Sequence, residues 1–256
     1  MTGTQEHARV VEAQFGPRAQ AYVDSAVHAG GADLDRLEAL AQAAAPRHAL
    51  DLGCGGGHVA YRLARHAAAV TACDLSADML AAVAATARTR GLIPIETIQA
   101  PAEQLPLASA HFDFLGCRFS AHHWRDLDAG LREARRVLQP GATAVFIDAV
   151  AAGSAMLDTH LQGIELLRDP SHVRDYTPAE WCAALARAGF QVRATQGWRL
   201  RMEFASWIAR MRTAPAHVEA IRSLQRAAAR ETRAYFAIEA DGSFMLDALL
   251  LEATAA

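Results

Sequence analysis

The sequence predicts an α/β protein with a mostly parallel β-sheet covered by helices on both faces. Short apolar or β-branched segments alternate with helical segments, which is the pattern of βαβ units. A glycine cluster at 53–57 directly follows the first of these strand-like segments. The chain has 256 residues, 52% of them hydrophobic and 21% charged, enough to bury a sizeable core. We therefore expect one globular domain.

The first half of the chain supplies the early βαβ units. Apolar residues recur at helical spacing near the N-terminus, interrupted by Gly16-Pro17 and Gly30-Gly31. Ser76 is a good N-cap for the alanine-rich helix that ends near Arg90. The expected elements are a helical flap within 1–45, a strand over 48–52, a helix over 58–66, a strand over 69–74 and a helix over 77–90.

The second half repeats the pattern and adds longer helical segments. Residues 46–150 form the expected core, and Thr177 opens a helix that ends near Gly189. Residues 151–176 and 203–238 are expected to be insertions that cap the carboxyl ends of the strands. The remaining expected elements are strands over 92–99, 112–117, 142–150, 191–200 and 244–252 and a helix over 127–138.

Composition excludes several classes of function. All 25 basic residues are arginine, so a P-loop lysine and lysine Schiff-base chemistry are absent. The chain also lacks asparagine, and with it every motif that needs one. The net charge of −3 argues against a nucleic-acid partner, because phosphate contacts need a concentrated basic face.

The cysteines and the N-terminus predict the compartment. The four cysteines show neither Cys-x-x-Cys pairing nor zinc-site spacing, which favours a reducing environment. The first residues lack a signal-peptide pattern, and no apolar run approaches a membrane span of about 18 residues. We expect a cytoplasmic protein with no metal ion and no membrane association.

The glycine cluster is the most informative motif. Ligands of open parallel sheets bind at the carboxyl ends of the strands, where this loop lies. A dinucleotide site needs Gly-x-Gly-x-x-Gly, but His58 stands where the third glycine would be. The remaining pattern is an acid followed by alternating glycines, made of Asp51, Gly53, Gly55 and Gly57.

Asp74 supports a nucleoside ligand. It ends the second predicted strand, next to the glycine loop, where a carboxylate can accept hydrogen bonds from both ribose hydroxyls. An acid at a strand end is also a common capping group. The interpretation of Asp74 as a ribose ligand therefore depends on its position next to the glycine loop.

The motifs together resemble a known family. Asp51 to Gly57 is similar to motif I of the class I S-adenosylmethionine methyltransferases. Ala102-Glu-Gln-Leu-Pro-Leu107, Phe112-Asp113, His122-His-Trp124 and Arg136-Val-Leu-Gln-Pro-Gly141 follow in the order of the type 11 methyltransferase domain, which includes ubiquinone/menaquinone methyltransferase-like relatives. The resemblance covers about residues 48–150. It implies a Rossmann-like, seven-stranded sheet with an antiparallel last strand, which 244–252 would supply.

The resemblance also implies a cofactor, S-adenosylmethionine, and its contacts. Asp51, Gly53, Cys54, Gly55 and Gly57 would line its methionine and ribose part, and Asp74 would hold the ribose. Leu75 and Met79 would pack near the adenine, and Ala102 and Glu103 would contact its edge. Pro101 replaces the family's usual aspartate, so it offers the adenine amino group no carboxylate.

Further candidates surround this site. Tyr22 and His28 would belong to the flap over the cofactor, and Arg118 would meet the cofactor's carboxylate or a substrate anion. His122 or His123 is a candidate base or substrate donor, with loop packing as the alternative role. Arg174 and Tyr176, within the first cap insertion, are candidates for substrate recognition, and the two arginines point to an acidic substrate.

These observations predict a methyltransferase that acts on a small molecule by in-line displacement. One alternative is a cofactor-binding protein of this fold that does not transfer methyl groups, and another is a methyltransferase of RNA or protein. A nucleotide-dependent oxidoreductase is disfavoured by His58.

Overall fold

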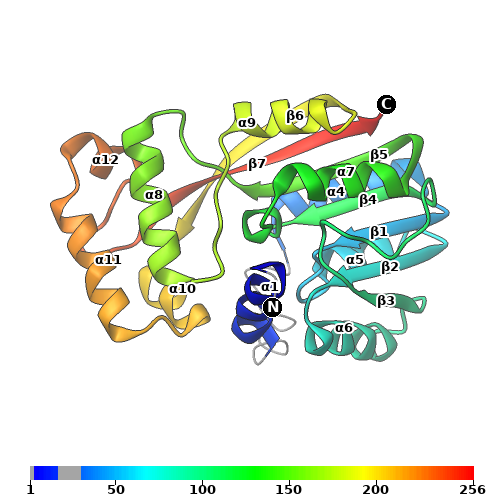
Figure 1. The fold of residues 1–256 in the computed structure, drawn as a ribbon, viewed down its shortest axis with the longest axis horizontal. Coiled ribbons are helices and arrows are strands. Elements are labelled where there is room, and N and C mark those ends of the chain that lie inside the picture. The colour runs from blue at the N-terminus through cyan, green and yellow to red at the C-terminus, as the bar shows by residue number, and fades with distance from the viewer. Residues whose placement is uncertain (1–2, 17–29) are drawn as a thin grey trace.

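The computed structural model describes residues 3–16 and 30–256, which form a layered α/β structure (Figure 1). Seven strands in these ranges build one sheet, in the order β3-β2-β1-β4-β5-β7-β6. The strands are β1 (His48–Leu52), β2 (Ala69–Asp74), β3 (Ile95–Gln99), β4 (Phe112–Arg118), β5 (Leu138–Ala149), β6 (Phe190–Met202) and β7 (Phe244–Ala255).

The first five strands run parallel, and β7 runs antiparallel to both of its neighbours, β5 and β6. The fold class predicted from the sequence is therefore confirmed, including the antiparallel last strand. Several strand limits differ from the prediction; β6 and β7, for example, extend to Met202 and Ala255. β3 begins at Ile95 rather than Leu92, directly after Pro94. β5 begins at Leu138 rather than Ala142, because Leu138 pairs with Phe112 across a register shift that accommodates Pro140-Gly141.

Helices cover both faces of the sheet. The core on one face packs α7 (Leu127–Val137) and α9 (Pro178–Arg187) against the strands. The core on the other face packs α4 (Ala32–Ala44), α5 (His58–Leu63) and α6 (Ala77–Thr89). Two predicted caps are confirmed: the Ser76 side chain accepts from the Met79 N–H, and Thr177 with Glu180 forms a capping box.

A third apolar cluster forms a lobe beyond the carboxyl ends of β4 and β5 (Figure 1). Its centre contains the fully buried side chains of Phe204, Trp207 and Phe244. Four helices build the lobe: α8 (Ala155–Arg168), α10 (Phe204–Met211), α11 (Pro215–Ala227) and α12 (Arg230–Tyr235). The two predicted cap insertions thus pack together. No helix in the described ranges is both long and apolar enough to cross a membrane.

Candidate functional site

A cavity of about 360 Å³ lies where β1, β2 and β4 end. Its walls come from the loop after β1, the ends of β2, β3 and β4, the 3₁₀ turn η2 (Ala121–His123) and α1 (Gly3–Phe15). Of the residues predicted from sequence, those that line it are Asp51, Gly53, Cys54, Gly55, Asp74, Leu75, Met79, Ala102, Glu103, Arg118 and His123.

The glycine loop needs its glycines for different reasons. Gly53 has φ +72°, and a Cβ there would lie 1.9 Å from the hydroxyl oxygen of Ser120. Gly55 has φ +47° and open space around its Cβ position. Because it has no side chain, a ligand in the cavity can approach its backbone closely. Gly57 does not line the cavity; it is the N-cap of α5, and a Cβ there would press on Val83.

Asp51 presents an unusual carboxylate to the cavity. The residue is 1% exposed, and its Oδ2 accepts a 2.8 Å hydrogen bond from the Ala60 N–H. Its Oδ1 is buried with no hydrogen-bond partner among the residues described. Burial, and then the nearby charge of Asp74, raise the pKa of Asp51 to about 7. A cationic donor placed in the cavity would therefore find an unsatisfied acceptor.

Asp74 ties the end of β2 to the glycine loop. Its Oδ2 accepts from the Gly55 N–H at 2.8 Å and its Oδ1 from the Ser76 N–H at 2.9 Å. Burial raises the pKa of Asp74, although these backbone hydrogen bonds oppose the shift. Each carboxylate oxygen has a second lone pair, so the group can accept further hydrogen bonds from a ligand.

The wall after β3 is mostly apolar. Ala100, Pro101 and Ala102 line the cavity beside Met79. Glu103 is also part of this wall, but its Oε1 accepts from the backbone N–H groups of Arg125 and Asp126, at 2.8 and 3.3 Å. The Glu103 carboxylate therefore holds the start of the segment that precedes α7.

Arg118 is tied to another side chain. Its Nε lies 2.5 Å from Oδ2 of Asp33 in α4, and both side chains are almost completely buried, at 7% and 5% exposed. Its guanidinium also stacks over Phe119, with Cζ 4.8 Å from the ring centroid. The charge that the sequence analysis assigned to a ligand carboxylate is thus already balanced inside the protein.

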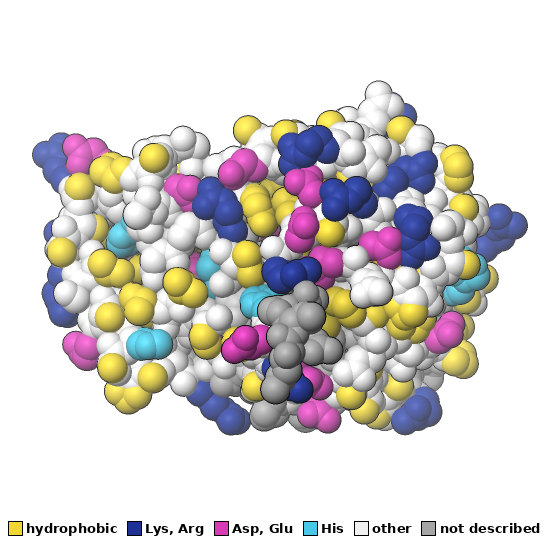
Figure 2. Space-filling model, in the orientation of Figure 1, with side chains coloured by type: hydrophobic (Ala, Val, Ile, Leu, Met, Phe, Trp, Pro, Cys, Tyr) yellow, Lys and Arg dark blue, Asp and Glu magenta, His cyan; other side chains and the backbone are white. Residues whose placement is uncertain are grey.

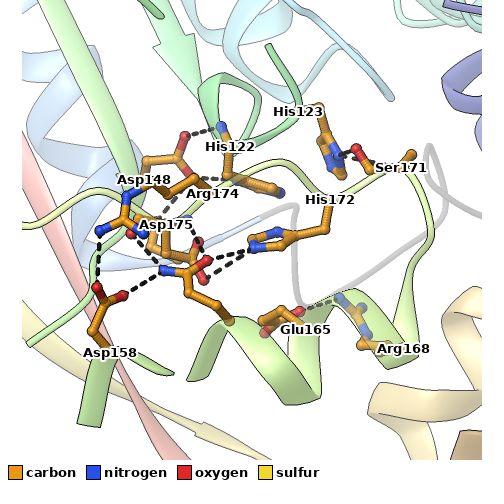
Figure 3. A network of polar contacts seen from close by, with 12 residues as sticks. His122, His123, Asp148, Asp158, Glu165, Arg168, Ser171, His172, Arg174 and Asp175 are labelled. Atoms are coloured by element: carbon orange, nitrogen blue, oxygen red, sulfur yellow. Dashed lines mark hydrogen bonds and ion pairs between the residues drawn. The ribbon is translucent and has the colours of Figure 1, made fainter. Parts of the chain in front are cut away.

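The two adjacent histidines of η2 have different surroundings (Figure 3). His122 does not line the cavity; its Nδ1 lies 2.5 Å from Oδ1 of Asp148. Burial opposes a charge on His122, but the charge and hydrogen bond of Asp148 prevail and raise its pKa to about 9. His123 lines the cavity, and burial together with the charge of His122 lowers its pKa to about 3.

The predicted substrate residues lie outside this cavity. Arg174 pairs with Asp158 at 2.8 Å and with Glu180 at 3.3 Å, and Figure 3 shows it directed toward Asp158. Tyr176 lines a separate depression of about 530 Å³ between α7 and α9. Arg125 lines both the depression and the cavity, so the two adjoin at that residue.

Two predicted site residues cannot be placed, and several residues that line the cavity were not predicted. Tyr22 and His28 lie outside the described residues, so their flap role stays a prediction. Three α1 residues that line the cavity were not predicted, although their helical spacing is visible in the sequence: His7, Val11 and Phe15. The other missed lining residues include Phe119, Ser120, Trp124 and Arg125, which surround the predicted Arg118 and His123.

The chain resembles proteins of one enzyme family. A model of the methyltransferase domain matches residues 50–146. The uncharacterized protein YafE of Escherichia coli K12 is 43% identical over 201 residues, covering 78% of this chain and 97% of that protein. The uncharacterized methyltransferase YcgJ of Bacillus subtilis is 30% identical over 246 residues, covering 94% of this chain and 97% of its own length.

The chain belongs to the methyltransferase domain family. The crystal structure of YcgJ superposes on this methyltransferase with a TM-score of 0.83, over 87% of this chain and 97% of the other. A ubiquinone biosynthesis O-methyltransferase of Pseudoalteromonas translucida is 30% identical over 159 residues, which is 59% of this chain and 66% of that protein. The cavity of this methyltransferase lies within the matched region, apart from the wall supplied by α1.

Proposed function

We propose that the protein is an S-adenosylmethionine-dependent methyltransferase of a small-molecule acceptor. The observation that carries this proposal is the buried, unpartnered Oδ1 of Asp51 in the wall of the cavity, beside the bare backbone of Gly55. A buried acceptor without a partner costs about 1–3 kcal/mol, so this arrangement favours a ligand that supplies a donor.

The residues present fit the cofactor. Asp51 would accept from the α-ammonium group of its methionine part, and Asp74 would accept from the two ribose hydroxyls. Leu75 and Met79 would pack on the adenine, and the backbone of Ala102 would take the place of the carboxylate that Pro101 lacks. S-adenosylmethionine, when bound, supplies a methyl group already activated by its bond to a sulfonium sulfur.

The chain's own contribution is position and exclusion of water. The part of the cavity wall that would hold the methyl donor is fixed, because the hydrogen bonds of Asp51 and Asp74 join β1, β2 and their loops. The lining of the cavity also includes the apolar residues Val11, Phe15 and Phe119. Such a site aligns an acceptor with the donor and keeps it dry, which is the main requirement of an in-line displacement.

A small acceptor is favoured over RNA. Acidic and basic side chains are interspersed on the described part of the face in Figure 2, without the concentrated basic area that phosphate binding needs. The ubiquinone O-methyltransferase among the relatives is named for a small-molecule pathway. We also propose a cytoplasmic location, supported by cysteines without disulfide partners, of which Cys54, Cys73 and Cys117 are buried.

Methyl transfer is tested with the full chain and S-adenosylmethionine labelled in its methyl group. We expect label to enter small molecules from a fractionated bacterial metabolite extract, and expect Asp74→Asn to reduce this transfer at limiting cofactor. Asp113→Asn is the matched control, because Asp113 also accepts two backbone hydrogen bonds but lies at the other end of β1, with Arg47 and His48. Label that enters only RNA or protein contradicts the small-molecule assignment.

A further inference from the structure

Figure 3 shows a cluster of polar side chains that adjoins the cavity at His123. His122 and His123 come from η2, Asp148 from β5, and Ser171 and His172 from the segment after α8. The rings of His122 and His123 are 4.1 Å apart, and only His123 reaches the cavity. The cluster therefore joins the cavity wall to the lobe.

The hydrogen bonds of His123 fix which ring nitrogen carries its proton. Nδ1 lies 3.1 Å from the carbonyl oxygen of Ser171, which can only accept. Nδ1 also lies 3.3 Å from the Ser171 hydroxyl, whose own proton is donated to Asp169 at 2.6 Å. Both contacts require a proton on Nδ1, so in the neutral ring Nε2 carries the lone pair.

The rest of the ring is held in place. Phe15 packs edge-on against it with centroids 5.0 Å apart, and His7 donates to the His123 carbonyl at 3.0 Å. Nδ1 is bound to Ser171, and no described residue forms a hydrogen bond with Nε2. Because His123 lines the cavity, the Nε2 lone pair is the part of the ring that can accept from a ligand there.

We propose that His123 is the catalytic base of this methyltransferase and that the acceptor is therefore a hydroxyl compound, with His122 and Asp148 as positioning residues. The inference rests on the proposed function and deepens it. Amines and thiolates reach a sulfonium methyl group without a base, whereas a hydroxyl oxygen must lose its proton. A carbon acid must lose its proton before it attacks, which needs a stronger base than a neutral imidazole. A neutral imidazole in the cavity wall can accept the proton of a hydroxyl oxygen.

The proposed step balances. The acceptor oxygen forms a bond to the methyl carbon as the carbon–sulfur bond breaks, and the electron pair of that bond stays on sulfur. The O–H electron pair stays on oxygen, and the proton passes to Nε2 of His123. One positive charge is lost at sulfur and one is gained on the imidazole. The ether leaves, and His123 returns its proton to solvent.

The charged groups around His123 determine when the proton moves. His122 faces it from η2, His7 from α1 and Asp148 from β5. Asp169 and His172 face it from the segment after α8. Glu165 and Asp175 act on it indirectly, because their charges affect His122. Burial and the His122 cation keep His123 neutral at all moderate pH values, because they lower its pKa to about 3. The proton therefore moves late, after bonding to carbon has made the acceptor oxygen strongly acidic.

The first test needs no acceptor. Nitrogen NMR of the full chain with ¹⁵N-labelled histidine, bound to S-adenosylhomocysteine, reports protonation of each ring, and His123→Gln identifies the His123 signals. At pH 7 we expect His123 as the neutral Nδ1–H form and His122 as the imidazolium. An Nε2–H form or an imidazolium at His123 overturns the proposal, whether or not the protein transfers methyl groups.

The second test uses catechol, a primary alcohol, a thiol, an amine and a carboxylic acid with labelled S-adenosylmethionine. We expect label in a hydroxyl compound and a kcat about 100-fold lower for His123→Gln, with the dissociation constant for S-adenosylhomocysteine unchanged. Label only in amines, thiols or carboxylic acids overturns this inference and leaves the proposed function standing. Failure to bind S-adenosylhomocysteine overturns the proposed function itself.

The role of the positioning residues is read from the pH profile. At S-adenosylmethionine concentrations that saturate the site at every pH, wild-type kcat/KM for the hydroxyl acceptor should stay flat from pH 8 to pH 5, without the limb near 6.5 that an ordinary histidine base gives. Asp148→Asn lowers the pKa of His122 and so removes its charge near neutral pH, which takes away one of the two causes that lower the pKa of His123. Burial still lowers it, so we expect an acid limb that moves to higher pH than in the wild type without reaching 6.5. Asp113→Asn should leave the profile flat. A limb near pH 6.5 in the wild type contradicts the proposed charge arrangement.

Discussion

At the scale of single residues, the site depends on two carboxylates with different environments. Asp51 has one buried oxygen without a partner, and Asp74 has both oxygens bound to backbone N–H groups. The spacing of the acid and the glycines predicted the position of Asp51, and the end of the second predicted strand predicted that of Asp74. The charge state was not predictable, because it depends on burial and on the approach of two chain segments.

Asp51 predicts that ligand binding is linked to proton release. Its pKa is about 7 in the ligand-free protein, and a cationic ammonium group beside it favours the ionised form. Affinity for S-adenosylhomocysteine should therefore increase as pH rises from about 5.5 to 7. Calorimetry in two buffers of different ionisation enthalpy measures the protons released. Asp51→Asn should bind more weakly and release none; equal release from this variant would contradict the assignment.

Asp74→Asn tests the ribose contact. The substitution replaces a charged acceptor of hydrogen bonds by a neutral one, so we expect a loss of about 1.5–3 kcal/mol in the binding of S-adenosylhomocysteine. Asp113→Asn also removes the charge from a carboxylate that accepts two backbone hydrogen bonds. This variant should bind S-adenosylhomocysteine as the wild type does. An unchanged dissociation constant for Asp74→Asn would remove Asp74 from the site.

The limits of sequence analysis are clearest at Arg118. Its partner Asp33 is 85 residues away, on a helix whose position against β4 is set only by the fold. Arg174 is similar, because Asp158 and Glu180 reach it from two helices. A sequence shows that an arginine follows a strand, but not which carboxylate the tertiary structure brings to it.

At the scale of elements, the glycine loop is the part whose geometry allows least variation. Strand β1, the loop and helix α5 were predictable because a strand, glycines and a helix follow each other directly. The family resemblance implied a helical flap within 1–45 over the cofactor, but it did not indicate that α1 itself lines the cavity, because nothing local in the sequence of α1 indicates which surface it covers. The lobe was predicted as two insertions, and one apolar cluster joins them, with Leu161 and Ile164 from the first and Phe204 and Trp207 from the second.

Gly53→Ala tests this loop against a matched substitution. Both Gly53 and Gly91 have positive φ, at +72° and +64°, but only Gly53 has a side chain, that of Ser120, where a Cβ would lie. Gly91→Ala should cost about 1–2 kcal/mol of unfolding free energy, the backbone penalty alone. Gly53→Ala should cost more and abolish binding of S-adenosylhomocysteine. Equal stability and retained binding in the two variants would contradict this geometry.

At the scale of the whole molecule, buried titratable groups join the cavity to the lobe. His122 and Asp175 have pKa values raised to about 9 and 8, and that of Asp51 is raised to about 7. For Asp175, burial and then the charge of Glu165 are the main causes. This cluster could not be predicted, because its members come from η2, β5, α8 and the segment after it.

These groups predict that stability falls as pH rises from 6.5 to 9. His122 binds a proton in the folded state up to about pH 9, Asp175 up to about pH 8 and Asp51 up to about pH 7. Within its own part of the window each group contributes a loss of about 1.4 kcal/mol per pH unit, because the unfolded state has already released that proton. Below pH 6.5, His123 and His172 act in the opposite sense, because burial lowers both pKa values. Urea unfolding at pH 6.5, 7.5 and 8.5 measures the slope, and Asp175→Asn should reduce it. Stability that rises over this range contradicts the assigned protonation states.

The central claim is that the cavity at the ends of β1, β2 and β4 binds S-adenosylmethionine. Titration calorimetry of the full chain with S-adenosylhomocysteine, and separately with NADH, tests it most directly. We predict saturable binding of one S-adenosylhomocysteine per chain, weakened in Asp74→Asn, and no binding of NADH. Saturable binding of NADH without binding of S-adenosylhomocysteine would contradict the claim.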